Sequence, residues 1–276
     1  MIKIGTYHFL EVHRIKSPGA FLTDGKENIL LPKKFLTPSL SIGDKINVFV
    51  YRDSEDRIVS TTQTPFAEVN QFAYLKVKAT DKIGAFLDWG LDKDLLLPFG
   101  EQKAKLRAGQ WILIYIFHDQ KTDRLAATAK VAKYFNSNPQ VDEGEEVELL
   151  ITNRTELGVN VVVDNKYKGL IFSNQLFHDV LEGDRVKGYV RNVRSDGKLD
   201  ITLQKRGLAN LEEGSQIILR ELKLADGKLP IHDKCSPEEI QTMLQMSKKN
   251  YKRSVGMLLR KKMIKLIPGG IELIRD

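Results

Sequence analysis

Apolar and polar residues alternate with a period of two in short runs over the first 204 residues of the chain, and turn residues separate the runs. In the first stretch the runs cover residues 7–14, 20–23, 29–31, 46–51 and 57–61. Successive side chains of a strand point to opposite faces, so this period predicts strands with one buried face. Five short strands within about 65 residues predict a small closed barrel, which leaves no sheet edge free.

The same pattern occurs three times along the chain. The glycine that leads the second run is Gly19, Gly84 or Gly158, and a turn glycine follows about 25 residues later in each copy. The last two runs of the later copies cover 111–117 with 124–129 and 185–193 with 198–203. A repeat of this length predicts tandem domains, and each leading glycine allows the sharp bend that a small barrel needs at its corners.

From about residue 206 the apolar residues take the spacing of helices. An apolar stripe predicts a first helix over 208–224. Ser236, Pro237 and Glu239 have the spacing of a helix N-terminus closed by a capping box, which predicts a second helix that ends near Gln245.

A further helix and a hairpin follow. Ser247 is a second N-cap, and the helix it begins extends to Lys262. Two alternating runs, 263–267 and 271–274, surround a Gly-Gly pair and predict a tight hairpin. This order of helices and hairpin predicts a winged helix, with 247–262 in the place of the recognition helix.

The expected fold is therefore mainly β with a C-terminal α+β domain. Three five-stranded barrels precede one winged helix. The expected domains are residues 1–64, 65–136, 143–205 and 208–276. Residues 62–65 and 136–142 are rich in turn residues and are expected to be linkers.

The barrels resemble a known domain in their recurring motifs. These motifs are Gly19-Ala20-Phe21, Gly84-Ala85-Phe86 and Gly158-Val159-Asn160, then Ile42-Gly43-Asp44, Ala108-Gly109-Gln110 and Glu182-Gly183-Asp184. Their order is similar to that of the S1 RNA-binding domain, a five-stranded member of the OB-fold group, over most of residues 1–204. The resemblance implies a ligand face made of aromatic rings on the second and third strands and charged residues near the last turn.

No copy keeps the whole pattern of that face. The residues that the resemblance implies as nucleic-acid contacts are Phe21 and Arg57 in the first barrel, Phe86 and Arg124 in the second, and Phe172, Arg194 and Lys198 in the third. His118 lies beside Asp119 at the same edge, and Arg191 lies in a basic segment of the third copy. The other interpretation of Phe21 and Phe86 is that they are core residues.

Such residues suit a single-stranded nucleic acid. A ring on a strand stacks a base for about 1–3 kcal/mol, and arginine or lysine meets the phosphates. One ring per barrel binds weakly, but linked barrels act at a high effective concentration once one of them is bound.

The predicted third helix is the most basic segment of the chain. Its proposed contact residues are Lys248, Lys249, Asn250, Tyr251, Lys252, Arg253, Arg260 and Lys261. Asp and Glu are absent between Ile240 and Gly270. The alternative to phosphate contact is a solvated helix face, on which cations near the C-terminus are also favoured by the helix dipole.

The arrangement as a whole is similar to that of the conserved virulence factor B family. The segments that carry this resemblance are Pro230-Ile231-His232-Asp233-Lys234, Ser236-Pro237-Glu238-Glu239 and Met246-Ser247-Lys248-Lys249. It implies RNA binding, expected to be to single strands, and post-transcriptional control of gene expression, including virulence genes where the organism has them.

Composition agrees with a polyanionic partner. The 276 residues carry a net charge of +7, and the pI is about 9.2. The single cysteine, Cys235, cannot form an internal disulfide, and we expect neither a signal peptide nor a membrane span, so the expected location is the cytoplasm.

Catalysis is not expected. The five histidines are scattered, and neither a metal-ligand spacing, a phosphate-binding glycine loop nor a nucleophile elbow is found, so we expect no metal, no cofactor and no enzyme activity. Two alternatives to RNA binding stay open: a transcription factor that reads DNA through the winged helix, and a scaffold for protein partners, which the sequence does not identify.

Overall fold

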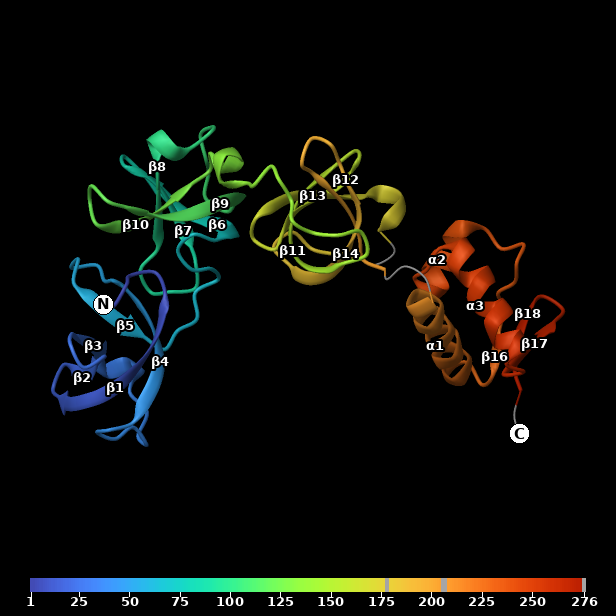
Figure 1. Ribbon diagram of the computed structural model, residues 1–276, viewed down its shortest axis with the longest axis horizontal. Helices are drawn as coiled ribbons and strands as arrows, with labels where there is room; N and C mark the ends of the chain where they lie inside the picture. The colour runs from blue at the N-terminus through green and yellow to red at the C-terminus, as the bar shows by residue number, and fades with distance from the viewer. Residues whose placement is uncertain (177–178, 205–207, 275–276) are drawn as a thin grey trace. The chain divides into compact units, whose positions relative to one another are not determined.

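The computed structural model describes residues 1–176, 179–204 and 208–274, and it describes no side chains for 208–212. The chain divides into two compact units, Met1–Phe135 and Asn136–Asp276. Figure 1 shows the order of elements along the chain: strands fill the first three quarters and helices dominate the last. The expected ends of the third barrel at 205 and of the winged helix at 276 lie outside the described residues.

The first and third repeats are closed five-stranded barrels. The strands of the first are β1 (Tyr7–Lys16), β2 (Gly19–Thr23), β3 (Asn28–Pro32), β4 (Lys45–Arg52) and β5 (Ile58–Thr61). Those of the third are β11 (Glu146–Thr155), β12 (Gly158–Val163), β13 (Tyr167–Phe172), β14 (Arg185–Val193) and β15 (Leu199–Thr202). Both follow one order, β1-β2-β3-β5-β4 and β11-β12-β13-β15-β14, and in both a parallel pairing of the third and fifth strands closes the barrel.

The second repeat differs in its closing seam. Its strands are β6 (Phe72–Asp81), β7 (Gly84–Asp88), β8 (Leu95–Pro98), β9 (Trp111–Asp119) and β10 (Arg124–Thr128), in the sheet order β10-β9-β6-β7-β8. Among the described strands, β8 and β10 lie against each other without a hydrogen-bonded ladder. The corresponding ladder in the first barrel is also short, because Leu30 and Val59 are the one described pair across it. The predicted fold class is confirmed, with two closed barrels and one half-barrel in place of three closed ones.

Short 3-10 turns complete the repeats. One follows each third strand: η1 (Lys33–Phe35), η2 (Phe99–Glu101) and η4 (Ser173–Gln175). Another, η3 (Val131–Tyr134), follows β10.

The leading glycine of each repeat has the backbone conformation that the sequence predicted. Gly19, Gly84 and Gly158 have φ angles of +148°, +157° and +148°. A Cβ atom at these positions would lie 2.0–2.3 Å from a carbonyl oxygen of the facing third strand. Any larger residue would therefore push the second and third strands apart.

The first two repeats share one hydrophobic core. Phe49 of β4 is fully buried, and its ring meets Trp89 of the second repeat edge-on, with the ring centroids 5.7 Å apart. Tyr51 and Val59 join the same buried cluster, which includes the apolar interior of the second sheet. Strand β4 thus buries both faces, one inside its own barrel and one against its neighbour. The third barrel has a separate core.

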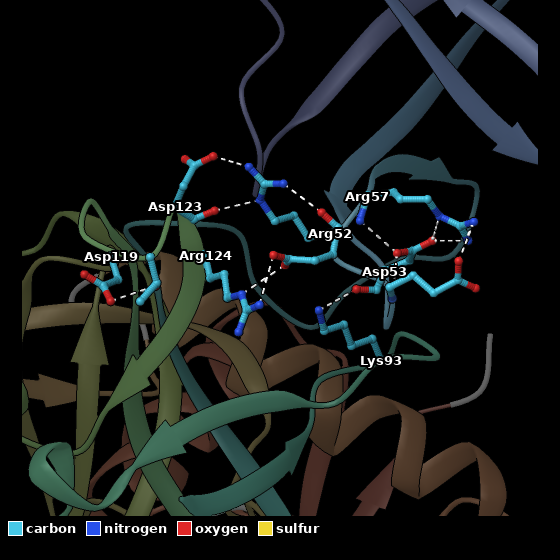
Figure 2. Close-up of polar contacts among 10 residues, drawn as sticks. Arg52, Asp53, Arg57, Lys93, Asp119, Asp123 and Arg124 are labelled. Atoms are coloured by element: carbon cyan, nitrogen blue, oxygen red, sulfur yellow. Dashed lines mark hydrogen bonds and ion pairs between the residues drawn. The ribbon is translucent and has the colours of Figure 1, made fainter.

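A set of ion pairs joins the turns of the first two repeats, as Figure 2 shows. The Arg124 guanidinium, on β10, donates two hydrogen bonds to the Asp56 carboxylate in the β4–β5 turn, both of 2.9 Å. In the opposite direction, Arg52 at the end of β4 forms an ion pair with Asp123 in the β9–β10 turn and donates to the Asp123 carbonyl oxygen at 2.8 Å. The hairpin turns of the two repeats therefore hold each other.

The electrostatics of these carboxylates follow from their partners. The hydrogen bond from Arg124 lowers the pKa of Asp56, and hydrogen bonds from Arg52 and then His118 lower the pKa of Asp123. Nearby, burial lowers the pKa of Lys93, whose ammonium donates to the Asp53 carbonyl oxygen at 2.6 Å. Bidentate arginine–carboxylate geometry gives such pairs direction as well as attraction.

The C-terminal domain has the order of a winged helix. Its elements are α1 (Leu208–Leu224), β16 (Lys228–Leu229), α2 (Pro237–Leu244), α3 (Lys248–Arg260), β17 (Ile264–Ile267) and β18 (Gly270–Leu273). The strands form a small sheet in the order β16-β18-β17. Strand β16 was not predicted, because two residues are too few to show an alternating pattern.

Both predicted caps are confirmed. The Ser236 hydroxyl accepts a hydrogen bond from the Glu239 amide at 3.1 Å, and the Glu239 carboxylate accepts one from the Ser236 amide at 2.6 Å. The Ser247 hydroxyl accepts from the Asn250 amide at 3.2 Å. Gln245, in the left-handed conformation, caps the end of α2. Two residues separate it from the first residue of α3, so the link between the helices is short. Within the described ranges, every helix is too short or too polar to cross a lipid bilayer.

We expect Phe49→Ala to lower the free energy of unfolding by about 3–5 kcal/mol, because it empties the core that the two repeats share. The matched control is Phe9→Ala on β1, where the side chain is 68 % exposed, and its effect should stay within about 0.5 kcal/mol. Denaturant unfolding followed by circular dichroism measures both. Equal losses for the two variants would show that Phe49 does not join the repeats.

We also expect the ion pairs at the turns to stabilise the N-terminal unit in a pH-dependent way. The folded pKa values of Asp56 and Asp123 are lowered. Their stabilising contribution is therefore present above the unfolded pKa, about 3.9, and is lost as the pH falls through the folded values.

The double variant Asp56→Asn with Asp123→Asn should unfold at a lower temperature than the wild type near neutral pH. The difference should shrink below about pH 4. Asp179→Asn, at an exposed aspartate of the C-terminal unit, is the control. A gap between double variant and wild type that is the same at both pH values would contradict the role of these carboxylates.

Candidate nucleic-acid interface

The third barrel presents a groove on the outer side of its second, third and last strands. Its volume is about 480 Å³, and its lining includes Leu157, Asn160, Lys168, Leu170, Arg194 and Lys198. Strand β13 alternates buried and accessible residues, so Lys168, Leu170 and Phe172 lie in one outward row. The groove thus combines apolar surface with three cations, and Glu156 supplies one carboxylate at its edge.

Phe172 and Arg194 form the most ordered part of this face. Phe172 is half-buried, and the Arg194 guanidinium carbon lies 5.5 Å from the centre of its ring. Asp200 holds the guanidinium through a 2.6 Å hydrogen bond to Nε. A ring and a cation fixed side by side provide one stacking position and one phosphate position.

The other cations of the third barrel are less fixed. Lys198 forms an ion pair with Asp196 at 2.6 Å, and this contact lowers the pKa of the Asp196 carboxyl. Both groups are about half exposed, so water competes with the pair. Arg191, on β14, is half-buried. Lys168 was not predicted, although its alternation with Leu170 and Phe172 places it on the same face.

The predicted rings of the first and second repeats occupy equivalent positions, each on the second strand of its repeat. Phe21 is half-buried, and the Arg14 guanidinium carbon lies 4.4 Å from its ring centre. Phe86 is half-buried on β7. Neither ring belongs to the buried clusters, so the core interpretation of Phe21 and Phe86 is not what the structure shows.

The predicted polar contacts of the first two repeats are already engaged. Arg124 holds Asp56, and the His118 Nε2 atom lies 2.8 Å from an Asp123 carboxylate oxygen. Arg57 pairs within its own turn, with Asp53 at 2.7 Å and Glu55 at 2.6 Å. Figure 2 shows Arg57 and Arg124 turned toward their carboxylate partners. In these two repeats the positions near the last turn therefore join the repeats or brace a turn.

Helix α3 separates its residues into two faces. Tyr251, Ser254, Val255 and Leu258 are buried at helical spacing. On the other side the exposed cations are Lys249, Lys252, Arg253, Arg260 and Lys261. No ion pair of Lys249, Lys252 or Arg253 occurs in the part of the chain that the structure describes.

Three residues predicted as contacts on α3 make contacts within the domain. Tyr251 is 2 % exposed, and its hydroxyl donates to the Ile231 carbonyl oxygen at 2.9 Å, so it is a core residue. Burial accordingly raises its pKa to about 12. The Asn250 side chain faces Gly214 of α1, where a Cβ atom would lie 3.0 Å from its amide nitrogen. Lys248 is half-buried and donates to the Cys235 carbonyl oxygen at 2.7 Å.

A second groove runs between α3 and the wing. Its volume is about 520 Å³, and its lining includes Lys252, Val255 and Leu259 of α3 and Leu266 of β17. Leu266 is 64 % exposed. In the wing, Lys265 forms an ion pair with Glu272 at 2.9 Å. Of the exposed α3 cations, Lys252 therefore lies at the edge of this groove.

Metal ligands do not converge in the described ranges. No group of three or more His, Cys, Asp or Glu side chains there is placed to hold a metal ion. The arrangement offers rings, cations and grooves, which are the components of a binding surface.

Two domain models match the chain. An S1 domain matches residues 4–63, and a CvfB-like winged helix domain matches residues 216–273. S1 and winged-helix domains are both typical of nucleic-acid-binding proteins.

Several curated proteins are similar to the chain over most of its length. It is 26 % identical to "Conserved virulence factor B" of Staphylococcus epidermidis, over 99 % of this chain and 95 % of the relative. It is also 26 % identical to the protein of the same name in Staphylococcus aureus, over 99 % and 94 %. "Uncharacterized protein YitL" of Bacillus subtilis is 26 % identical over 88 % and 84 %.

Among solved structures, the chain matches a multidomain protein with nucleic acid binding domains from Streptococcus pneumoniae. The identity is 23 %, the match covers 98 % of each chain, and the TM-score is 0.42. Together, the two domain matches and the full-length similarity confirm the resemblance to the conserved virulence factor B family that the sequence motifs predicted.

Proposed function

We propose that this protein binds single-stranded RNA through the outward face of the third barrel and the exposed cations of α3, and that it acts in post-transcriptional regulation of gene expression. One observation carries the proposal. The cations on the α3 surface lack carboxylate partners in the described ranges. The charged residues predicted as contacts in the first two repeats, by contrast, form ion pairs between or within those repeats.

The chemistry of the third barrel favours a single strand. Phe172 offers a ring on a strand, with Arg194 beside it and Lys168 in the same outward row. Only unpaired bases expose their flat faces for such stacking, and stacking is tolerant of sequence. This supports a single-stranded ligand at the third barrel.

The α3 cations supply the second part. Contacts between lysine or arginine and phosphates give affinity that is independent of sequence and falls with salt. Two weak sites on one chain also reinforce each other, because binding at one raises the effective concentration at the other. The name of the staphylococcal relatives, "Conserved virulence factor B", supports a regulatory role that includes virulence genes.

The proposal includes a binding role without catalysis, a cytoplasmic location and no membrane contact. A second candidate is a DNA-binding regulator, since α3 occupies the place of a recognition helix and borders a groove with the wing. Filter binding with single-stranded RNA, single-stranded DNA and duplex DNA over a range of salt separates the two. Tight preference for the duplex would favour the second candidate, and binding that ignores salt would contradict both.

We expect Lys252→Glu with Arg253→Glu to weaken RNA binding, because both cations are exposed on α3. The slope of log K against log salt should become shallower by about 1.4, because each phosphate that a cation no longer neutralises on a single strand lowers it by roughly 0.7. Gel shifts over a salt series measure both the affinity and the slope.

The matched control is Lys3→Glu with Lys26→Glu, which reverses two exposed charges on the first barrel. It changes the net charge by the same amount and should leave the slope nearly unchanged. If both double variants lose affinity equally, the effect is one of net charge, and α3 is not the contact surface.

A further inference from the structure

The second repeat carries aromatic rings on a face that the S1 resemblance does not use. Strands β6 and β9 pair with Tyr74 opposite Leu113 and Phe72 opposite Tyr115. The residues between them point inward and are buried, so the outer side of this strand pair is aromatic. We call Tyr74, Trp111, Tyr115 and Tyr134 the outer aromatic surface.

The rings of this surface form two stacks. Tyr74 and Trp111 lie nearly parallel, at 11°, with their centroids 5.9 Å apart. Tyr115 and Tyr134 lie at 14°, with centroids 3.8 Å apart. Since Trp111 and Tyr115 are four residues apart on β9, the stacks are separated along the strand by about 13 Å.

Trp111 differs from its neighbours in its exposure. Phe72, on the same face, is 1 % exposed because Phe135 stacks on it at 4.5 Å. Trp89 is 3 % exposed, and its indole N–H donates to the Lys93 carbonyl oxygen at 2.6 Å. Trp111 instead stays 48 % exposed, so much of its ring is open to a further flat group.

Cations lie beside both stacks of the outer aromatic surface. Lys76 lies directly opposite Trp111 across the β6–β9 pair and is exposed. The turn before Trp111 is tied to Val77, next to Lys76, by two backbone hydrogen bonds of 2.8 Å, and this turn holds the exposed Arg107. Lys133 lies 5.0 Å from the ring centre of Tyr134.

The net charge near Trp111 is positive. Asp88 lies beside Lys76 on β7, but Lys103, Lys105 and Arg107 precede Trp111 and are all exposed. Glu101, the acidic residue of that loop, is engaged by the Thr128 hydroxyl. The loop therefore contributes cations rather than carboxylates.

The other two barrels lack this arrangement at the corresponding described positions. In the first barrel, Phe9 is exposed at the position of Tyr74, with Asn47 across from it, and Lys45 takes the position of Trp111. In the third, Glu148 and Arg185 take these two positions. The stacked rings are therefore not a general requirement of this barrel.

We propose that the outer aromatic surface of the second repeat is a separate binding site for single-stranded nucleic acid. Bases stack on the open face of Trp111, which Tyr74 supports from the other side, and phosphates meet Lys76 and Arg107. Flat parallel rings with unpaired cations at their rim match a base and its phosphate better than they match an apolar peptide. The site extends the proposed RNA-binding function and rests on it.

The test uses the full chain and a short oligouridylate as the probe. The chain has two tryptophans, and only Trp111 is exposed. Adding the probe should therefore quench the tryptophan emission of the wild type. In Trp111→Phe, where only Trp89 emits, the probe should change the emission little.

Affinity provides the second measurement. Trp111→Ala should weaken binding by at least about fivefold, because the variant has no indole on which a base can stack, while the salt slope stays unchanged. Trp111→Phe should recover part of the affinity, since it keeps a ring. Phe9→Ala removes an exposed ring at the position in the first barrel that corresponds to Tyr74, and it should bind like the wild type.

The outcomes separate this proposal from the broader one. If Trp111→Ala binds the probe as tightly as the wild type, and the emission of the wild type does not change on binding, the site on the second repeat is refuted while RNA binding stands. The surface would then serve a protein partner instead. If no variant shows salt-sensitive binding, the proposed function fails as well.

Discussion

The contact between the first two repeats governs the rest of the molecule. Strand β4 buries Phe49 and Tyr51 against the second sheet, and the apolar cluster that results is continuous across both repeats. Barrels of about 65 residues have small cores of their own. Sharing one core lets two of them act as a single compact unit, Met1–Phe135.

This contact also occupies positions that the S1 resemblance implies as ligand contacts. Docking brings the hairpin turns of the two repeats together, and Arg52, Asp56, Asp123 and Arg124 become partners of one another. These positions lie near those that the S1 resemblance assigns to a nucleic acid. The third barrel keeps Phe172, Arg194 and Lys168 on an accessible face. The repeated pattern thus serves assembly in the first two copies, whereas the same face stays accessible in the third.

Local signals in the sequence predicted local structure well. The capping box at Ser236 and the leading glycines, such as Gly84, depend on neighbouring backbone groups, and both were predicted. The docking of the repeats was not, because it depends on which surfaces meet. The one available signal was the unbroken apolar run 48–51, which departs from the alternation of a strand buried on one face.

The candidate site shows the same limit. The exposed cations of α3 were predicted from their density, but Tyr251 was placed on the surface although its spacing from Val255 and Leu258 is that of a buried helical face. The pairing of Arg124 was beyond prediction, because its partner Asp56 is 68 residues away in sequence. A sequence shows which residues are charged, but the tertiary structure decides which of them form ion pairs.

The open seam of the second repeat has a consequence for its dynamics. Strands β8 and β10 meet without a ladder, whereas three residue pairs join β13 to β15. Because no hydrogen-bonded ladder joins these two strands, we expect local opening to begin at this seam. The N-terminal unit, whose two repeats share one core, therefore also contains the seam at which we expect local opening.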